Sequence, residues 1–399
     1  MLTPKQMEKY ADVLWWGLTT ARSRTFKKND LVLIRYDLPA LSLAEVLYAR
    51  LLERGLHPVQ RLNLTPPMEY QFYKQSSRAQ LIFEQPGDRE LYERLNGSIS
   101  LLAPPSLTHL NTIDPGKIGK AAVARKRLRD ILDRREATGA FSWTLGLFPT
   151  EALAQHAQLA LPAYVHQVVA ACFLNKKAPI DAWQGIFAQA TTLKKWLNSL
   201  KVKSYRIESE RVDLVISPGE MRKWIGISGH NIPSFEVFLS PDWRGTRGRY
   251  FADQPSFRNG NYVKDVCLEF EKGSAVRVEA AIGEDFVKKQ LTMDKGACRL
   301  GEFSLTDRRF SKITRFMANT LYDENFGGRY GNCHLALGAS YADTFAGDPK
   351  TLTRKHKTRL GFNDSALHWD LVNTEKKRVT ARLATGEVTT IYENGQFVY

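Results

Sequence analysis

The residues best suited to chemistry gather in the C-terminal half of the chain. Residues 323–341 read DENFGGRYGNCHLALGASY and combine two carboxylates, His334, Tyr341 and four glycines. Glycines cost backbone entropy and bury no side chain, so a cluster of them indicates backbone held close to something small. This composition is unlike that of a core segment, and we interpret the stretch as part of a functional site.

Three further segments carry the same residue types. Residues 363–370 read NDSALHWD, and in a strand His368 and Asp370 would point to the same face and could share one ion. Glu236 and Glu302 lie in the apolar surroundings NIPSFEVFLSP and RLGEF. Burying an unpaired carboxylate costs on the order of several kcal/mol, so each of these glutamates needs a partner.

Each of these side chains also has an ordinary explanation. The glutamates could pair with arginines, Glu324 could end a helix in solvent, and a lone histidine is usually a satisfied core or surface residue. Taken together, they form a carboxylate and imidazole set without the cysteine ligands that structural zinc sites prefer. Such a set fits two hydrolytic divalent ions about 3.5–4 Å apart.

The first half of the chain must provide a scaffold. Its apolar patterns predict strands at 30–36, 58–64, 98–103 and 141–148, alternating with helices at 4–22, 42–54, 117–138 and 183–197. Alternation of this kind predicts an α/β domain, residues 1–200, with a mainly parallel, doubly wound sheet. No G-x-G-x-x-G follows the first strand, so a dinucleotide site is not supported.

The second half has a different texture. Short strands are predicted at 212–217, 224–228, 235–239, 265–270, 275–280, 378–383, 389–393 and 396–399, with one helix at 307–322. These elements predict a β-rich, α+β C-terminal domain, residues 201–399. All the candidate site residues belong to it, so we expect this domain to bind the metal.

Bulk composition limits the other classes of function. The formal net charge is +15, from 57 lysines and arginines against 42 acidic residues. The densest basic run, residues 117–135, also holds aspartates, has helical apolar spacing and lacks aromatic residues for base stacking, which favours a solvated helix face over nucleic-acid binding. No run is apolar enough to span a membrane, the N-terminus lacks a signal-peptide pattern, and four distant cysteines indicate free thiols. We therefore expect a cytoplasmic protein.

At the candidate site the chain resembles the metallo-aminopeptidases typified by thermophilic aminopeptidase T and by aminopeptidase S. The resemblance covers most of the C-terminal half. It consists of N-x-P-x-x-E-V-F-x-x-P, L-G-E, Y-D-E-N followed by G-N-x-H-x-A-L-G-x-x-Y, and N-D-S-x-x-H-x-D, in that order. It implies that Glu302 bridges two metals and that Tyr341 is the active-site tyrosine. The metal ligands it implies are Glu236, Glu302, Glu324, His334, His368 and Asp370.

The resemblance also implies an activity. We expect a homodimeric enzyme that removes N-terminal residues from short peptides with two divalent cations, Zn, Co, Mn or Mg. One alternative is a metal-dependent phosphoesterase or nuclease, which would need an arginine or lysine such as Arg329 beside the ligands. Another is a non-catalytic nucleic-acid-binding relative, which predicts salt-sensitive binding and no turnover.

Overall fold

The structure is a computed structural model that describes all of residues 1–399, and it divides into two compact units. Unit 1 comprises Met1–Phe187, Ile227–Ser234 and Met317–Leu321. Unit 2 comprises Ala188–Gly226, Phe235–Phe316 and Tyr322–Tyr399. The chain therefore returns to unit 1 twice after first leaving it.

Unit 1 is built on a five-stranded sheet in which every neighbouring pair is parallel, as the alternating pattern predicts. In spatial order the strands are β2 (His57–Leu62), β1 (Leu31–Tyr36), β3 (Gly97–Leu102), β4 (Ser142–Leu147) and β7 (Asn231–Ile232). The strand β7 is a short piece that the sequence patterns did not predict.

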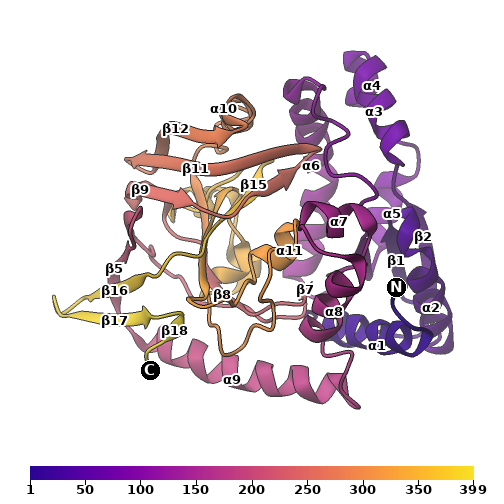
Figure 1. Cartoon of the computed structure of the whole chain (residues 1–399), viewed down its shortest axis with the longest axis horizontal. Coiled ribbons are helices and arrows are strands. Elements are labelled where there is room, and N and C mark those ends of the chain that lie inside the picture. The colour runs from indigo at the N-terminus through magenta and orange to yellow at the C-terminus, as the bar shows by residue number, and fades with distance from the viewer. The chain divides into compact units, whose positions relative to one another are not determined.

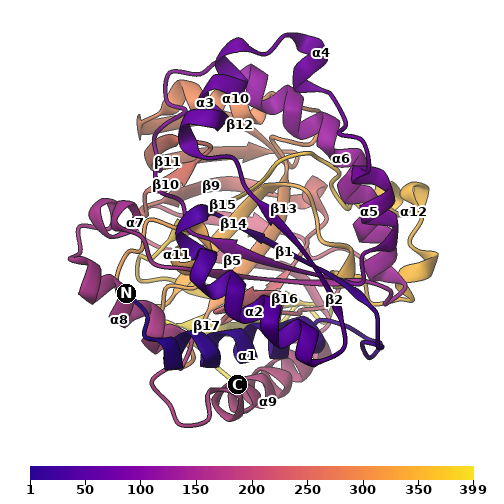
Figure 2. The ribbon, with the colours of Figure 1, turned by 90° about the vertical axis from the view of Figure 1, so that its right-hand side faces the viewer.

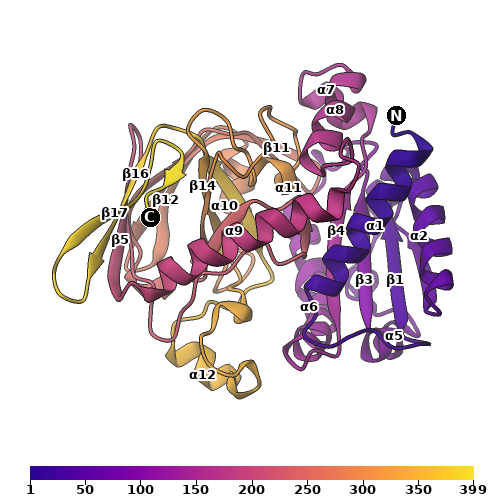
Figure 3. The same cartoon turned by 90° about the horizontal axis from the view of Figure 1, so that it is seen from below.

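Helices cover both faces of this sheet. On one face, Trp143 of β4 packs against the same buried cluster as Leu91 of α5 (Asp88–Arg94) and Leu132 of α6 (Pro115–Ala137). On the opposite face of β4, Gly146 lies against Tyr10 of α1 (Pro4–Thr20). The hydroxyl of Tyr10 makes hydrogen bonds with the backbone of Leu147. The helix α2 (Leu41–Glu53) packs beside α1 (Figures 2 and 3). The arrangement is that of a doubly wound sheet.

The remaining helices of unit 1 are short, apart from α9, which continues into unit 2. They are the 3-10 helix η1 (Leu38–Ala40), α3 (Pro66–Gln75), α4 (Arg78–Leu81), α7 (Glu151–His156), α8 (Leu161–Ala171) and α9 (Pro179–Ser199). The helix α2 begins directly after η1, without a side-chain cap. No helix combines the length and apolar composition that crossing a lipid bilayer requires.

Unit 2 contains two antiparallel sheets (Figure 1). The larger has nine strands: β10 (Ser256–Arg258), β11 (Asn261–Glu271), β9 (Arg247–Ala252), β6 (Asp213–Ile216), β5 (Val202–Glu208), β16 (Arg378–Leu383), β17 (Val388–Glu393) and β18 (Gln396–Phe397), with β12 (Ser274–Ile282) paired to β11. Two helical elements accompany this larger sheet. The helix α10 (Glu284–Leu291) packs on β11 and β12, and the 3-10 turn η2 (Trp243–Gly245) precedes β9.

The smaller sheet of unit 2 has the order β15 (His368–Asn373), β14 (Asn332–Gly338), β13 (Leu300–Thr306) and β8 (Glu236–Leu239). Aromatic residues connect it to the larger sheet, because Phe303 packs against both Tyr205 and Trp224. The hydroxyl of Tyr250 also donates to backbone carbonyls of Cys333 and Leu371. One face of the small sheet is thus buried, and the other face is left for the candidate site.

The helix predicted at 307–322 is wrong; only α11 (Thr320–Asp323) is helical there. Asp307 accepts hydrogen bonds from the backbone of Arg309 and Phe397, and Ser311 accepts one from the backbone of Ile313. Side chains that satisfy the backbone locally compete with helix formation. The apolar side chains that suggested a helix are nevertheless buried.

The strand predicted at 224–228 is also wrong. Only Ile225 pairs, through one isolated bridge to Phe238. Gly226 and Ile227 both have positive φ, +132° and 50°, outside the extended region typical of a regular strand. A Cβ on Gly226 would lie 2.1 Å from the carbonyl oxygen of Glu236, so the chain turns here because it passes against β8.

Candidate metal centre

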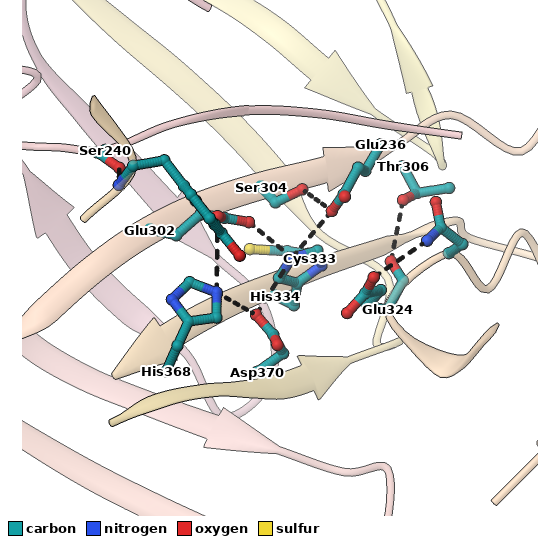
Figure 4. A network of polar contacts seen from close by, with 12 residues as sticks. Glu236, Ser240, Glu302, Ser304, Thr306, Glu324, Cys333, His334, His368 and Asp370 are labelled. Atoms are coloured by element: carbon teal, nitrogen blue, oxygen red, sulfur yellow. Dashed lines mark hydrogen bonds and ion pairs between the residues drawn. The ribbon is translucent and has the colours of Figure 1, made fainter. Parts of the chain in front are cut away.

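The four strands of the small sheet bring the predicted site residues to one face. Glu236 pairs with Thr306 and His334 with Ser304, while Ala336 lies between Glu302 on one side and Asp370 on the other. Because alternate residues of a strand share a face, these registers align the functional side chains. Figure 4 shows the convergence of Glu236, Glu302, His334, His368 and Asp370.

His334 lies at the centre of the cluster. Its Nε2 is 3.1 Å from Oε2 of Glu236 and 3.1 Å from Oε1 of Glu302, and 3.8 Å from Oδ1 of Asp370. Candidate ligand atoms of His334, Glu236 and Glu302 all lie within 4.8 Å of one another. A set of three buried donors this close is compatible with one shared cation.

A second imidazole completes the arrangement. His368 Nε2 lies 3.5 Å from Oδ1 of Asp370 and 3.9 Å from Oε2 of Glu302. The carboxylate of Glu302 therefore lies between the two imidazoles, with Oε1 toward His334 and Oε2 toward His368. This is the geometry of a carboxylate that can bridge two ions.

The side chain of Glu324 is held next to this cluster but outside its tightest part. Glu324 directly follows α11, is 6% exposed, and its carbonyl oxygen accepts hydrogen bonds from Thr306 and Asn332 at the end of the sheet. Burial raises the pKa of its carboxyl group well above the usual value, and the charges of Glu236 and Asp370 raise it further. Figure 4 shows its side chain on the side of the cluster away from His368.

The carboxylates are too many for the two imidazoles to neutralise. Burial raises the pKa of Glu302 to about 7, and repulsion by Glu236 adds to this, although the bond to His334 opposes it. Burial alone would lower the pKa of His334, but its bonds to Glu236 and Glu302 raise it well above the usual value. Divalent cations would relieve this crowding of negative charge, so the residues fit a metal centre.

The pair His368 and Asp370 has opposite shifts. Burial would raise the pKa of Asp370, but the field and hydrogen bond of His368 lower it to about 2. For His368, burial would lower the pKa, but Asp370 raises it to about 9. The Nδ1 of His368 lies 3.0 Å from the carbonyl of Ala339, so Nδ1 donates there and Nε2 is directed at the carboxylates.

Several supporting residues escaped the sequence patterns. Ser304 donates to Oε2 of Glu236 at 3.2 Å, and its position two residues after Glu302 on a strand was the available signal. Ala339 acts through its backbone carbonyl, so its residue type gave no indication of this role. Asn363, the first residue of the segment 363–370, donates from Nδ2 to the carbonyls of Gly296 and Gly338.

Tyr341 lies at the open side of the cluster. Its ring contacts those of His368 and Phe238, with centroids 4.7 and 5.7 Å apart, and its backbone N–H donates to Ser240 Oγ. The side chain is 36% exposed. Desolvation beside the carboxylates, and the charge of Glu302, raise the pKa of Tyr341 well above its usual value, so the hydroxyl stays protonated.

The structure also shows what the centre lacks. Cys333 precedes His334 on the strand and so points to the other face, where burial raises its pKa to about 11. Arg329 is exposed and its guanidinium lies over the ring of Tyr330. Arg258 donates to the backbone carbonyl of His368. The phosphate clamp that a phosphoesterase would need is therefore not provided by Arg329.

Comparison with known proteins gives a consistent picture. Residues 3–397 match the family model described as thermophilic metalloprotease (M29). The chain is 29% identical over 245 residues to aminopeptidase AmpS of Bacillus subtilis, a match that spans 58% of each protein. It is 27% identical over 307 residues to aminopeptidase T of Thermus aquaticus, over 72% of this chain and 73% of that one.

A solved structure shows the same fold. Wild-type AmpT from Thermus thermophilus superimposes with a TM-score of 0.79, covering 100% of both chains at 20% sequence identity. The likeness extends over both units. At this identity the comparison concerns the fold.

Proposed function

The chain belongs to the thermophilic metalloprotease family M29, and from that premise we propose that it is a metal-dependent aminopeptidase. Its substrates are short peptides with a free N-terminus, from which it removes the first residue. The named relatives are aminopeptidases, which supports this activity over the phosphoesterase and nucleic-acid-binding alternatives.

The observation that carries the proposal is the position of Glu302. Its two oxygens face two different imidazoles, His334 at 3.1 Å and His368 at 3.9 Å. Glu236 would complete one ion site with His334, and Asp370 would complete the other with His368. Glu324 would join the first of these sites, because it lies on the side of Glu236.

Divalent ions held by these residues would activate water near neutral pH and polarise the scissile carbonyl. The protein residues position what reacts. Ser304 fixes the carboxylate of Glu236, and Ala339 fixes the imidazole of His368. The protonated hydroxyl of Tyr341 donates a hydrogen bond to the oxygen on which negative charge develops, a role in which preformed donors are effective.

The proposal has further parts. The two cations are drawn from Zn, Co, Mn and Mg, since oxygen and imidazole donors accept all of these. Residues 1–200 and 201–399 act as scaffold and catalytic domains. The protein works as a homodimer in the cytoplasm. Light scattering of the purified protein measures the oligomeric state.

One assay tests the activity. The purified protein, loaded in turn with Zn²⁺, Co²⁺, Mn²⁺ or Mg²⁺, is offered leucine p-nitroanilide, its N-acetylated form and bis(p-nitrophenyl) phosphate. Cleavage of the unblocked amide alone is the expected result. Cleavage of the blocked amide or of the phosphodiester contradicts the proposal. So does the absence of any cleavage by protein that holds about two ions of any of these metals per chain.

A further inference from the structure

The segment between Tyr341 and Asn363 leaves the small sheet and returns to it. We call residues 342–362 the basic arm. It contains η3 (Ala342–Thr344), η4 (Pro349–Thr351) and α12 (Arg354–Arg359), and in Figure 3 α12 stands out from the sheets of unit 2. The arm has its own small core, formed by Phe345, Leu352, Leu360 and Phe362. It is therefore a folded feature of the surface.

The arm carries uncompensated positive charge. The helix α12 reads RKHKTR, and none of its four lysines and arginines forms an ion pair. Other helices with basic residues contain at least one ion pair within the helix: Lys126 pairs with Asp130 in α6, and Lys288 with Glu284 in α10. On the arm, Asp348 caps the backbone N–H of Lys350. Such a cluster repels itself and favours an anionic partner.

The base of the arm is linked through Arg222 and Ser240 to the backbone of Tyr341. The guanidinium of Arg222 donates to the carbonyls of Leu360 in the arm and Ser240 beside it, and lies 3.4 Å from the ring centroid of Phe362. Ser240 Oγ in turn accepts from the backbone N–H of Tyr341. The arm thus begins directly after the tyrosine of the site, and Ser240 contacts both that tyrosine and the arginine that holds the arm.

Given the proposed aminopeptidase activity, on which this step rests, we propose that the basic arm binds the carboxylates of the substrate peptide beyond the cleaved bond. While the metal centre holds the N-terminal residue, the C-terminal part extends by about 3.3–3.6 Å per residue. The preferred substrates are then short peptides with acidic residues toward their C-terminus. An aminoacyl p-nitroanilide has no such carboxylate and makes no contact with the arm.

The side chains of the arm favour a peptide over other polyanions. Its phenylalanines, Phe345 and Phe362, are buried and offer no platform for stacking bases. Its remaining large apolar residues, Leu352 and Leu360, are buried as well, so the arm has no apolar face to insert into a lipid surface. The side chains that the arm presents to solvent are flexible lysines and arginines. Such side chains can pair with carboxylates held in many different positions.

The test compares two variants of equal charge. The arm variant carries Arg354→Gln, Lys355→Gln, Lys357→Gln and Arg359→Gln, which keep good helix formers in place. The control variant neutralises four exposed lysines outside the arm: Lys5→Gln, Lys27→Gln, Lys201→Gln and Lys203→Gln. Substrates are leucine p-nitroanilide, the peptide Leu-Ala-Glu-Glu-Glu and the uncharged Leu-Ala-Gln-Gln-Gln amide, at low and high salt.

The expected result is specific to the acidic peptide. In the arm variant its KM rises about five- to tenfold at low salt, as two or three lost exposed ion pairs predict, with kcat unchanged. High salt raises the KM of the parent protein toward that of the variant because it screens the charges. The uncharged peptide and the p-nitroanilide are unaffected, and the control variant behaves as the parent protein.

Other outcomes overturn the inference. An equal KM change for the charged and uncharged peptides, or the same change in the control variant, excludes a specific role of the arm. Loss of binding to single-stranded DNA or to phosphatidylserine vesicles, with peptide kinetics intact, assigns the arm to another partner. Inactivity of the parent protein on the p-nitroanilide contradicts the aminopeptidase proposal itself; the arm is then judged by fluorescence anisotropy of a labelled Leu-Ala-Glu-Glu-Glu, whose binding the arm variant must weaken.

Discussion

At the scale of single residues, the site combines strongly coupled groups with a donor that stays neutral. Sequence spacing alone predicted that His368 and Asp370 share a face, because a strand places residues two apart on the same side. The sheet registers do bring Glu236, Glu302 and His334 to them. Their role as metal ligands stays a prediction. Ala339, which orients His368, could not be found from sequence because it acts through its backbone.

A substitution at Tyr341 can distinguish a role in stabilising the transition state from a role in binding the substrate. We expect Tyr341→Phe to lower kcat on leucine p-nitroanilide about 10²–10³-fold with little change in KM, as removal of a preformed oxyanion donor does. The phenylalanine ring keeps the contacts to His368 and Phe238. Metal content by atomic emission and the melting temperature serve as controls. A mutant with unchanged kcat would show that this hydroxyl does not act in the reaction.

Glu302 allows metal binding and stability to be tested together. In metal-free protein near pH 8 its carboxylate is ionised and crowded, because its pKa is about 7. We expect Glu302→Gln to stabilise the metal-free protein by about 1–3 kcal/mol, as replacing a poorly compensated buried charge does.

The same change must remove the effect of metal. The parent protein gains stability with added Zn²⁺ or Co²⁺ by mass action, whereas the variant gains much less. Denaturant titrations with and without chelator measure both quantities. The matched control is Glu271→Gln, an exposed glutamate of β11. Equal metal-induced stabilisation of parent and Glu302→Gln would contradict the bridging role.

At the scale of elements, sequence patterns were least informative for long strands that are buried on both faces. All seven residues of β13 and all seven of β14 are buried, so neither strand has the alternation that predicts a half-buried strand. The spacing of Phe310, Ile313 and Met317 suggested a helix, although these residues are buried in irregular chain. The spacing of apolar residues predicts which side chains are buried. It predicts a helix correctly only where the backbone also forms the hydrogen bonds of a helix.

The turn at Gly226 is predicted to hold β8 in place. A Cβ there would meet the carbonyl of Glu236 at 2.1 Å, and its φ of +132° disfavours any side chain. We expect Gly226→Ala to destabilise the protein by about 2 kcal/mol or more, because strain in the backbone adds to the clash. It should also weaken metal binding, since β8 carries Glu236.

Gly185 provides the matched comparison. It lies inside α9, and an added Cβ meets nothing within 4 Å. Gly185→Ala should stabilise by about 0.5–1 kcal/mol through helix propensity. Urea denaturation measures both variants, and isothermal titration with Zn²⁺ measures the affinity. Similar stabilities for the two variants would mean that the contact with β8 is not tight.

At the scale of the whole molecule, the fold explains why the chemistry belongs to one unit. Every candidate ligand lies in unit 2, on strands whose partners are distant in sequence. The alternation of strands and helices in unit 1 is local, and it was predicted from sequence for that reason. The antiparallel pairing of unit 2 depends on contacts across more than a hundred residues, such as β16 with β5, which no local pattern encodes.

The last prediction concerns the pH dependence of global stability, through a cation away from the metal centre. Lys377 is 3% exposed, and burial lowers its pKa from 10.5 to about 8, although the charges of Cys333, Asp253 and Glu375 oppose the shift. Between pH 8 and 10.5 the unfolded chain holds this proton and the folded protein does not, so the free energy of unfolding rises with pH. The full rise is about 3.4 kcal/mol, of which about 2.5 kcal/mol falls between pH 7 and 10. In Lys377→Met, denaturant titrations from pH 7 to 10 should lack this rise and start from a higher stability at pH 7. Identical pH profiles for the two proteins would show that the lysine is solvated in solution.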